Sequence, residues 1–227
     1  MVETRAGWGG KGLAGARVSG GLKHILLVVA TAASAAVLLV SGIAVAPAAA
    51  FGTPIACGSP SQSAVFAPWG DANAYFRVSN GGFENGATDW ALSGGAAVVA
   101  GNEWYAVGGA SDSHSLKIPY NGAAESRTLC VSRNQNVVRL FVNNQHVSGA
   151  ILHVEAWAQN PATGAWAVTA FDVNGDVSSS WNPTPQLQIP NMFGGSGNEY
   201  LYLRFTTRGS VATWNVDDVY IDPFKNW

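Results

Sequence analysis

The chain has 227 residues, with 12 basic and 14 acidic side chains that give a net charge of −2 at pH 7. Only 11% of the residues are charged, and the basic ones form no cluster. A positive patch is needed to neutralise the phosphates of nucleic acid or of anionic lipid, so the sequence predicts neither as a partner.

Residues 1–50 have the pattern of an export signal. Basic residues are spread from Arg5 to Lys23, the stretch 25–46 carries no charge, and the small residues of 46–50 suit a signal peptidase. The uncharged stretch is also long enough to span a bilayer as a hydrophobic helix, so a retained membrane anchor is the alternative. We expect a secreted or cell-envelope protein that contacts the membrane only if this segment is retained.

Residues 51–73 are rich in Gly, Pro, Ser and Ala and predict an extended arm ahead of a domain that covers 74–227. The arm contains Cys57, and the only other cysteine is Cys130. In an exported protein such a pair predicts one disulfide, with two free buried thiols as the alternative. The bond would tie the arm to the middle of the domain and contribute about 4 kcal/mol in the chain-entropy view.

After the arm, hydrophobic residues recur with a period of two, and no segment shows the 3.6-residue period of a helix. Short segments at this spacing predict an all-β fold, an antiparallel sandwich of two sheets. We expect strands over 74–78, 96–100, 115–118, 127–131, 137–142, 150–157, 166–171, 200–206 and 215–221.

Two motifs frame this region, Asn-Gly-Gly-Phe-Glu at 80–84 and Val-Asp-Asp-Val at 216–219. The layout resembles the jelly-roll carbohydrate-binding modules of galactose-binding-like fold, whose first and last strands often read this way. Pro-Trp-Gly-Asp at 68–71 adds a similarity to exported bacterial single-domain proteins of unknown activity. The resemblance implies a jelly roll in which the first and last strands are paired.

The same resemblance implies a structural calcium ion. In such modules an acidic residue of the first strand and one of the closing pair often hold calcium, which here points to Glu84, Asp217 and Asp218. Calcium takes six to eight oxygens, so backbone carbonyls would complete the set. The alternative is that Asp217 and Asp218 accept hydrogen bonds from loop amides without a metal.

Strand alternation assigns side chains to faces. Leu152, Val154 and Ala156 are expected in the core, as are Leu201, Leu203 and Phe205 on a second strand, and Val138, Leu140 and Val142 on a third. Aromatic and charged side chains then share the outer surface. The candidate ligand-binding residues are His153, Glu155, Trp157, Tyr202, Arg204 and Arg139.

Aromatic plates beside charged groups are typical of sugar sites, because a ring stacks on the apolar face of the sugar while polar groups bind its hydroxyls. We therefore expect a non-catalytic module that binds a polysaccharide or a cell-surface glycan on this face, or on loops carrying Trp90, Trp104 and Tyr105. A cross-strand Glu–Arg pair with a structural role is the simpler alternative for the face. For the whole protein, the alternatives are a structural or protein-interaction sandwich of the envelope and a glycoside hydrolase.

Overall fold

The structure is a computed structural model that describes residues 53–133, 137–144, 147–175 and 180–222. These residues belong to one compact unit, 44–227. The predicted leader lies outside the described residues. Within the described part of the chain, no helix is both long and apolar enough to cross a membrane.

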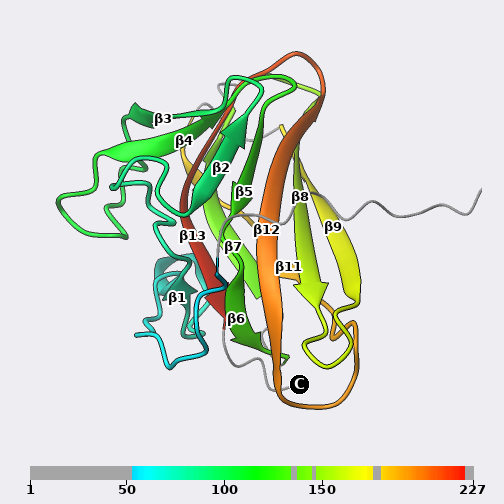
Figure 1. Ribbon diagram of the computed structural model, residues 1–227. Helices are drawn as coiled ribbons and strands as arrows, with labels where there is room; N and C mark the ends of the chain where they lie inside the picture. Colours follow the sequence, from blue (N-terminus) through cyan, green and yellow to red (C-terminus); the bar gives the residue numbers. More distant parts are fainter. Residues whose placement is uncertain (1–52, 134–136, 145–146, 176–179, 223–227) are drawn as a thin grey trace, which may run out of the picture. The chain divides into compact units, whose positions relative to one another are not determined.

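Two antiparallel sheets pack face to face, which confirms the predicted all-β sandwich (Figure 1). The first sheet runs β2 (Trp90–Ser93), β5 (Ala123–Ser126), β12 (Asn198–Gly209), β8 (Ala150–Gln159) and β9 (Trp166–Asn174), with β6 (Leu129–Ser132) also paired to β12. The second runs β10 (Asn182–Pro183), β7 (Val137–Asn143), β13 (Trp214–Asp222), β4 (His114–Ile118) and β3 (Ala97–Ala100), with β1 (Phe76–Arg77) on β13 and β11 (Leu187–Gln188) on β7.

The core lies between the sheets and follows the predicted alternation. Leu152, Val154 and Ala156 of β8 are fully buried, and so are Leu201, Leu203 and Phe205 of β12. The inner residues of β7 join the same cluster. Because each strand turns alternate residues inward, the remaining residues of β8 and β12 form one outer face.

Four strands were not predicted, namely β2, β5, β10 and β11. All four are two to four residues long, and β5 reads Ala-Ala-Glu-Ser, residues that rarely favour strands on their own. The position of such short strands is set by hydrogen bonding to their neighbours. Glu125 of β5 lies opposite Arg204 of β12, and β2 pairs with β5 in turn.

The arm folds onto the outer face of the second sheet. Phe66 packs against Phe141 of β7 with ring centroids 5.6 Å apart, just before the short 3-10 helix η1 (Ala67–Trp69). The buried residues of this arm cluster are Phe66, Tyr75, Val137, Phe141, Trp181 and Tyr220. The second sheet is therefore covered on both sides, by the core and by the arm.

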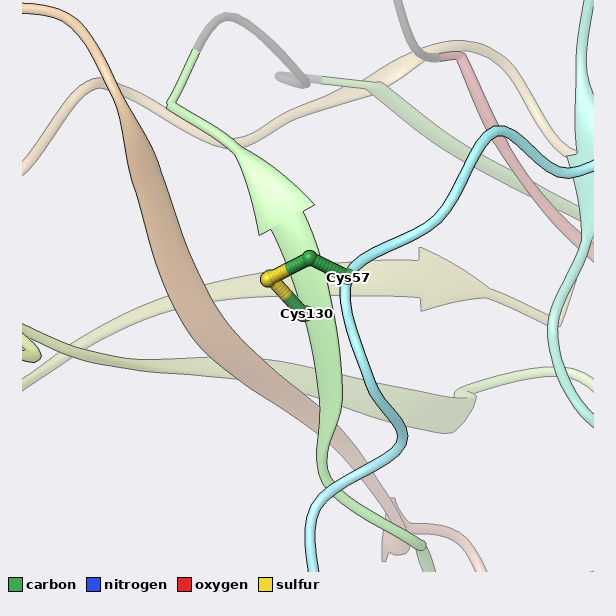
Figure 2. Close-up of a disulfide and its surroundings, with 2 residues drawn as sticks. All are labelled: Cys57 and Cys130. Atoms are coloured by element: carbon green, nitrogen blue, oxygen red, sulfur yellow. A yellow bond between two sulfur atoms is a disulfide. The ribbon is translucent and has the colours of Figure 1, made fainter.

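The predicted disulfide between Cys57 and Cys130 is present and joins the arm to β6 (Figure 2). Beside it, Ile55 pairs with Leu129 in a parallel bridge, and the Cys130 amide donates to the Ile55 carbonyl at 3.1 Å. The covalent bond and these backbone hydrogen bonds together fix the start of the arm on the first sheet.

The two framing motifs meet in space, as the resemblance implied. β1 pairs with β13, and just beyond it the amide of Val78 donates to the carbonyl of Val219 while the amide of Val219 donates to the carbonyl of Gly81. A side chain at Gly81 would place its Cβ 2.8 Å from the Val219 oxygen, so only glycine fits there. A bulge in β13 follows Asp217, and Asp218 adopts a φ of 47°.

Candidate functional site

The outer face of the first sheet carries two parallel rows of side chains that cross the strands. Tyr202 of β12 lies opposite Trp157 of β8, and one register step along the strands Arg204 lies opposite Glu155. Residues two apart on a strand are separated by roughly 6–7 Å, about the width of a sugar ring. We call Trp157 and Tyr202, together with Trp166 one register step away on β9, the aromatic row, and we call Glu125, Arg204 and Glu155 the charged row.

The rings of the aromatic row pack against one another and form an apolar surface. The rings of Trp157 and Tyr202 are parallel within 2° at a centroid distance of 6.0 Å, and Trp166 packs edge-on to Tyr202 at 5.3 Å. Tyr202 is only 2% exposed, whereas Trp157 and Trp166 are partly exposed and the neighbouring Val168 is 45% exposed. Trp157 and Trp166 are thus the rings that a ligand can reach, and Tyr202 holds them in place.

The charged row is a chain of ion pairs. Arg204 lies between two carboxylates, with Nε 3.0 Å from Glu125 Oε1 and Nη1 3.4 Å from Glu155 Oε2. The indole Nε1–H of Trp157 donates to the same Glu155 oxygen at 3.0 Å. Glu155 therefore links the charged row to the aromatic row and fixes the orientation of the Trp157 ring.

His153 lies one register step from Glu155 on β8 and opposite Asp172 of β9. Its Nδ1 lies 2.6 Å from Asp172 Oδ1, and its Nε2 lies 3.4 Å from Glu155 Oε1. The imidazole is nearly buried, but half of the Asp172 side chain is exposed. Asp172 is therefore the most accessible carboxylate of the face, and His153 is a spacer that keeps the two carboxylates apart.

The face has an excess of negative charge. Burial raises the pKa of Glu125, and repulsion by Glu155 adds to that rise, although the Arg204 guanidinium opposes it. Burial also raises the pKa of the Tyr202 hydroxyl, and both glutamates contribute. A single arginine does not compensate the carboxylates around it.

Five of the six predicted ligand-binding residues lie together on this face, and Arg139 does not. Arg139 belongs to β7 in the second sheet, where its Nη1 contacts Asp71 at 2.8 Å and its guanidinium lies 4.2 Å from the Phe66 ring centroid. The alternation placed Arg139 on an outer face, but that face belongs to the second sheet, so Arg139 does not lie beside Arg204. The arm covers it.

Three residues of the face were missed by sequence reasoning. Trp166 and Asp172 alternate in phase along β9, so the period-two pattern of Trp166, Val168, Ala170 and Asp172 was the available signal. Glu125 offered no signal, because β5 was not predicted. Its role depends entirely on the pairing of β5 with β12.

The loop aromatics divide between core and surface. Trp90 is 1% exposed and belongs to the core, whereas Trp104 is 63% exposed and Tyr105 43%. Tyr105 and Trp69 of the arm border a cavity of about 340 Å³ that is otherwise apolar, lined by Val65, Pro68, Trp69, Tyr105 and Val107. This loop has exposed rings, and its Asp112 is ion-paired with Arg77 at 3.9 Å.

The predicted calcium set does not assemble around a common point. The carboxylate of Glu84 accepts hydrogen bonds from the amides of Ser113 and His114 at 2.8 and 2.7 Å, and its second oxygen contacts both of their side chains. These bonds, working against desolvation, lower the pKa of Glu84 to about 2. Through these bonds Glu84 holds the start of β4 in place.

Three other acidic side chains do lie close together. One carboxylate oxygen from each of Glu103, Asp112 and Asp218 lies within 4.8 Å of the others. The Asp112 side chain is 4% exposed, and its Oδ2 accepts no hydrogen bond of ordinary geometry from the described residues. The bulge in β13 points Asp218 into this group, and Arg77 Nη1 lies 3.3 Å from Asp218 Oδ1. We call Glu103, Asp112 and Asp218 the acidic group.

Burial of so many carboxylates is costly unless a proton or a cation neutralises them. Burial and repulsion by Asp218 raise the pKa of the adjacent Asp217 to about 9. Burial and repulsion by Asp112 raise the pKa of Asp218 to about 7, despite the nearby guanidinium of Arg77. Asp217 itself accepts hydrogen bonds from the amides of Glu103 and Asp218.

The fold is similar to several solved carbohydrate-binding modules. A family 61 module in complex with β-1,4-galactotriose shares 15% identity over 64% of this chain and 96% of its own, with a TM-score of 0.39. The xylan-binding family 22 module of Paenibacillus barcinonensis Xyn10C shares 20% over 64% and 93%, with a TM-score of 0.41.

A domain of an enzyme is also similar. The enzymatically active domain of tailspike protein 4 from bacteriophage CBA120 shares 14% identity over 64% of this chain and 21% of its own, with a TM-score of 0.44. No protein-family model and no curated protein sequence matches the chain. At this level of similarity the solved structures do not assign a ligand or an activity to the face described above.

Proposed function

We propose that this protein is an exported, non-catalytic carbohydrate-binding module that binds glycan on the outer face of the first sheet. The observation that carries the proposal is the aromatic row beside the charged row, spaced by one sugar width on a sheet face that the described arm leaves open. The disulfide supports export, because such bonds persist in oxidising compartments.

Binding would use a preformed surface. A pyranose ring stacks its apolar face on Trp157, and its hydroxyls then lie over the charged row, where Arg204 donates and Glu155 accepts. The Tyr202 ring and the indole hydrogen bond to Glu155 hold Trp157 in one orientation before the ligand arrives. Little conformational entropy is then lost on binding, which favours affinity.

The ion pairs argue against glycoside hydrolysis. A hydrolase needs two carboxylates that face each other across the scissile bond. Here Glu125 and Glu155 both bind the guanidinium of Arg204, which fills the space between them. A sugar bond has no place between these two side chains, so we expect no hydrolysis products when the protein is incubated with a glycan that it binds.

The test is a glycan array followed by calorimetry on the purified protein and on Trp157→Ala. The variant should lose roughly tenfold or more in affinity, because one stacking ring is worth up to about 1.5 kcal/mol beyond the area it buries. Trp104→Ala is the matched control: it removes an exposed tryptophan from a loop and should bind like the wild type. Melting temperatures of both variants verify that they fold.

The opposite result identifies the alternative. If Trp104→Ala loses binding and Trp157→Ala does not, the glycan binds the loop that carries Trp104 and Tyr105, and the sheet-face proposal is wrong. If no glycan binds the wild type at all, a structural or protein-interaction role in the cell envelope becomes the favoured function.

We also propose that calcium, if the domain uses it, binds the acidic group instead of the set that includes Glu84. The support is the buried Asp112 Oδ2, which has no hydrogen-bond partner of ordinary geometry among the described residues. It lies beside Glu103 and Asp218 in a group whose one described counter-charge is Arg77. Carboxylate oxygens suit a calcium ion, and the ion would stabilise the fold without taking part in glycan chemistry.

A further inference from the structure

The charge arrangement on the sheet face bears on which glycans the face selects. Glu125 and Glu155 both contact Arg204, and His153 links Glu155 to a third carboxylate, that of Asp172. Because the two glutamates offset the charge of the guanidinium, Arg204 gives an anionic substituent little net attraction. Even with His153 counted as a cation, two positive groups do not offset three carboxylates, so the patch keeps a net negative charge.

The other cations of the face are paired or distant, so they do not reverse this. Arg127, two residues after Glu125, pairs with Asp89 at 3.2 Å. Arg208 lies on β12 opposite Ile151, one register step beyond the level of His153 and Asp172. At the spacing of residues along and across strands it is roughly 12 Å from Asp172, which exceeds the screening length of about 8 Å at physiological ionic strength. Beyond the opposite end of the row, Arg133 interacts with the carboxylate of Glu199 and donates to the Gly194 carbonyl.

The carboxylates are also placed where sugar substituents would lie. Glu125 and Glu155 are one register step from Trp157, and Asp172 is two steps away. A sugar stacked on Trp157 and the next sugars of the chain would present their ring substituents to these levels. The Asp172 side chain is half exposed, and those of Glu125 and Glu155 are 19% and 15% exposed, so all three can contact a bound substituent.

Resting on the proposed function, we infer that the face selects glycans with free amino groups, of the glucosamine type, over neutral glycans and rejects those with carboxylate or sulfate groups. A protonated amine forms charge-assisted hydrogen bonds with the carboxylates of Glu125 and Asp172. A uronate or sulfate would meet the same carboxylates with like charge, and Arg204 is already paired.

The test compares oligosaccharides of equal length: glucosamine, N-acetylglucosamine and galacturonate. Titration calorimetry is run near pH 6, about two units above the ordinary carboxylate pKa, on the purified full chain. The glucosamine oligomer should bind roughly three- to tenfold more tightly than its N-acetylated form, since each accessible charge pair is worth up to about 1 kcal/mol. The preference should shrink when salt is raised from about 50 to about 500 mM.

Single-residue variants test whether the carboxylates of Glu125 and Asp172 cause the preference for glucosamine. Glu125→Gln and Asp172→Asn should each lose about three- to fivefold in affinity for the glucosamine oligomer and stay within about twofold for the N-acetylated one. Arg208→Gln removes a charge from the same face at a distance and should change neither affinity by more than about twofold. Unchanged melting temperatures show that the losses are not unfolding.

Two results would overturn the inference, and they differ in what they leave standing. In the first, a neutral glycan such as N-acetylglucosamine binds through Trp157 and glucosamine binds no better, or galacturonate binds best. The proposed selectivity is then wrong, but the binding site on the sheet face remains. If none of the oligomers binds and the glycan array is also blank, the proposed function fails together with the selectivity.

Discussion

Asp71 is the residue that locks the arm to the second sheet. Its Oδ2 accepts hydrogen bonds from the Tyr75 hydroxyl, the Arg139 guanidinium and the Gln186 amide at 2.6, 2.8 and 2.9 Å. Burial opposes ionisation, but these bonds hold the pKa of Asp71 at about 2. A buried carboxylate with this many donors must stay ionised for the arm to dock.

We therefore predict that Asp71→Asn lowers the free energy of unfolding by about 2 kcal/mol at pH 7, measured in urea. The folded pKa lies below the ordinary 3.8, so the contribution is complete above pH 4 and is lost as the pH falls through about 2. The difference in unfolding free energy between wild type and variant should therefore shrink toward zero as the pH falls through this range. Adding Arg139→Met to the Asp71→Asn variant should recover part of the loss, because it removes the unpaired buried cation.

Equal urea midpoints for the wild type and Asp71→Asn at pH 7 would contradict this account of Asp71. A constant difference down to pH 2 would mean that the aspartate contributes by packing and not by charge. The comparison is best made in the same buffer series, since other carboxylates titrate nearby and change both proteins alike.

At the residue scale, the sequence predicts which side of a strand a side chain occupies but not what lies over that side. Arg204 and Arg139 alternate identically and both face outward, yet one remains 34% exposed on the candidate site and the other is buried under Phe66. The difference comes from the arm, whose Gly- and Pro-rich stretch has no periodicity that could reveal where it docks.

At the scale of elements, the arm depends on one covalent bond near its start. Cys57 and Cys130 are 73 residues apart in the chain, and the bond between them limits how far the unfolded chain can expand. The arm also contributes Phe66 to the cluster over β7 and β13. The bond and the cluster stabilise the same docked arrangement.

Replacing both cysteines with serine should lower the free energy of unfolding by about 4 kcal/mol, the loop-closure value for a ring of this size. Urea unfolding of the variant should coincide with that of the reduced wild type and should not respond to reductant. A wild-type protein whose stability is the same with and without reductant would show that the arm cluster alone holds the arm.

Strand prediction succeeded where alternation was long and failed where strands were short. All nine predicted segments overlap strands, and runs such as 150–157 and 200–206 lie wholly within β8 and β12 because they alternate over several residues. β5 was missed although it positions Glu125, since its register is set by β12 and by no property of Ala-Ala-Glu-Ser. A site assembled across strands is therefore only partly visible in a linear sequence.

At the scale of the whole domain, the first and last strands close the fold beside the acidic group. Asp218 comes from the last strand, whereas Glu103 and Asp112 come from the loop between β3 and β4. A cation held by these three would join two distant parts of the chain. It would also compete with Arg77, whose side chain is 38% exposed and is able to swing into solvent.

We predict that calcium at about 100 times its dissociation constant raises the melting temperature by roughly 5–10 °C. Asp112→Asn should abolish that rise, and Glu84→Gln, which removes a carboxylate of the originally predicted set, should keep it. Arg77→Gln should increase calcium affinity by removing the competing charge. A rise that disappears in Glu84→Gln but survives in Asp112→Asn would restore the set implied by the resemblance.

The disulfide also changes what a proteolytic cut does to this protein. The segment it encloses, from Cys57 to Cys130, includes the loop with Trp104 and Tyr105, whose exposed side chains mark chain that a protease can reach. A single cut anywhere in that segment leaves the two fragments covalently joined. A nicked molecule would keep its original mass, apart from one added water, and would separate into fragments only on a reducing gel.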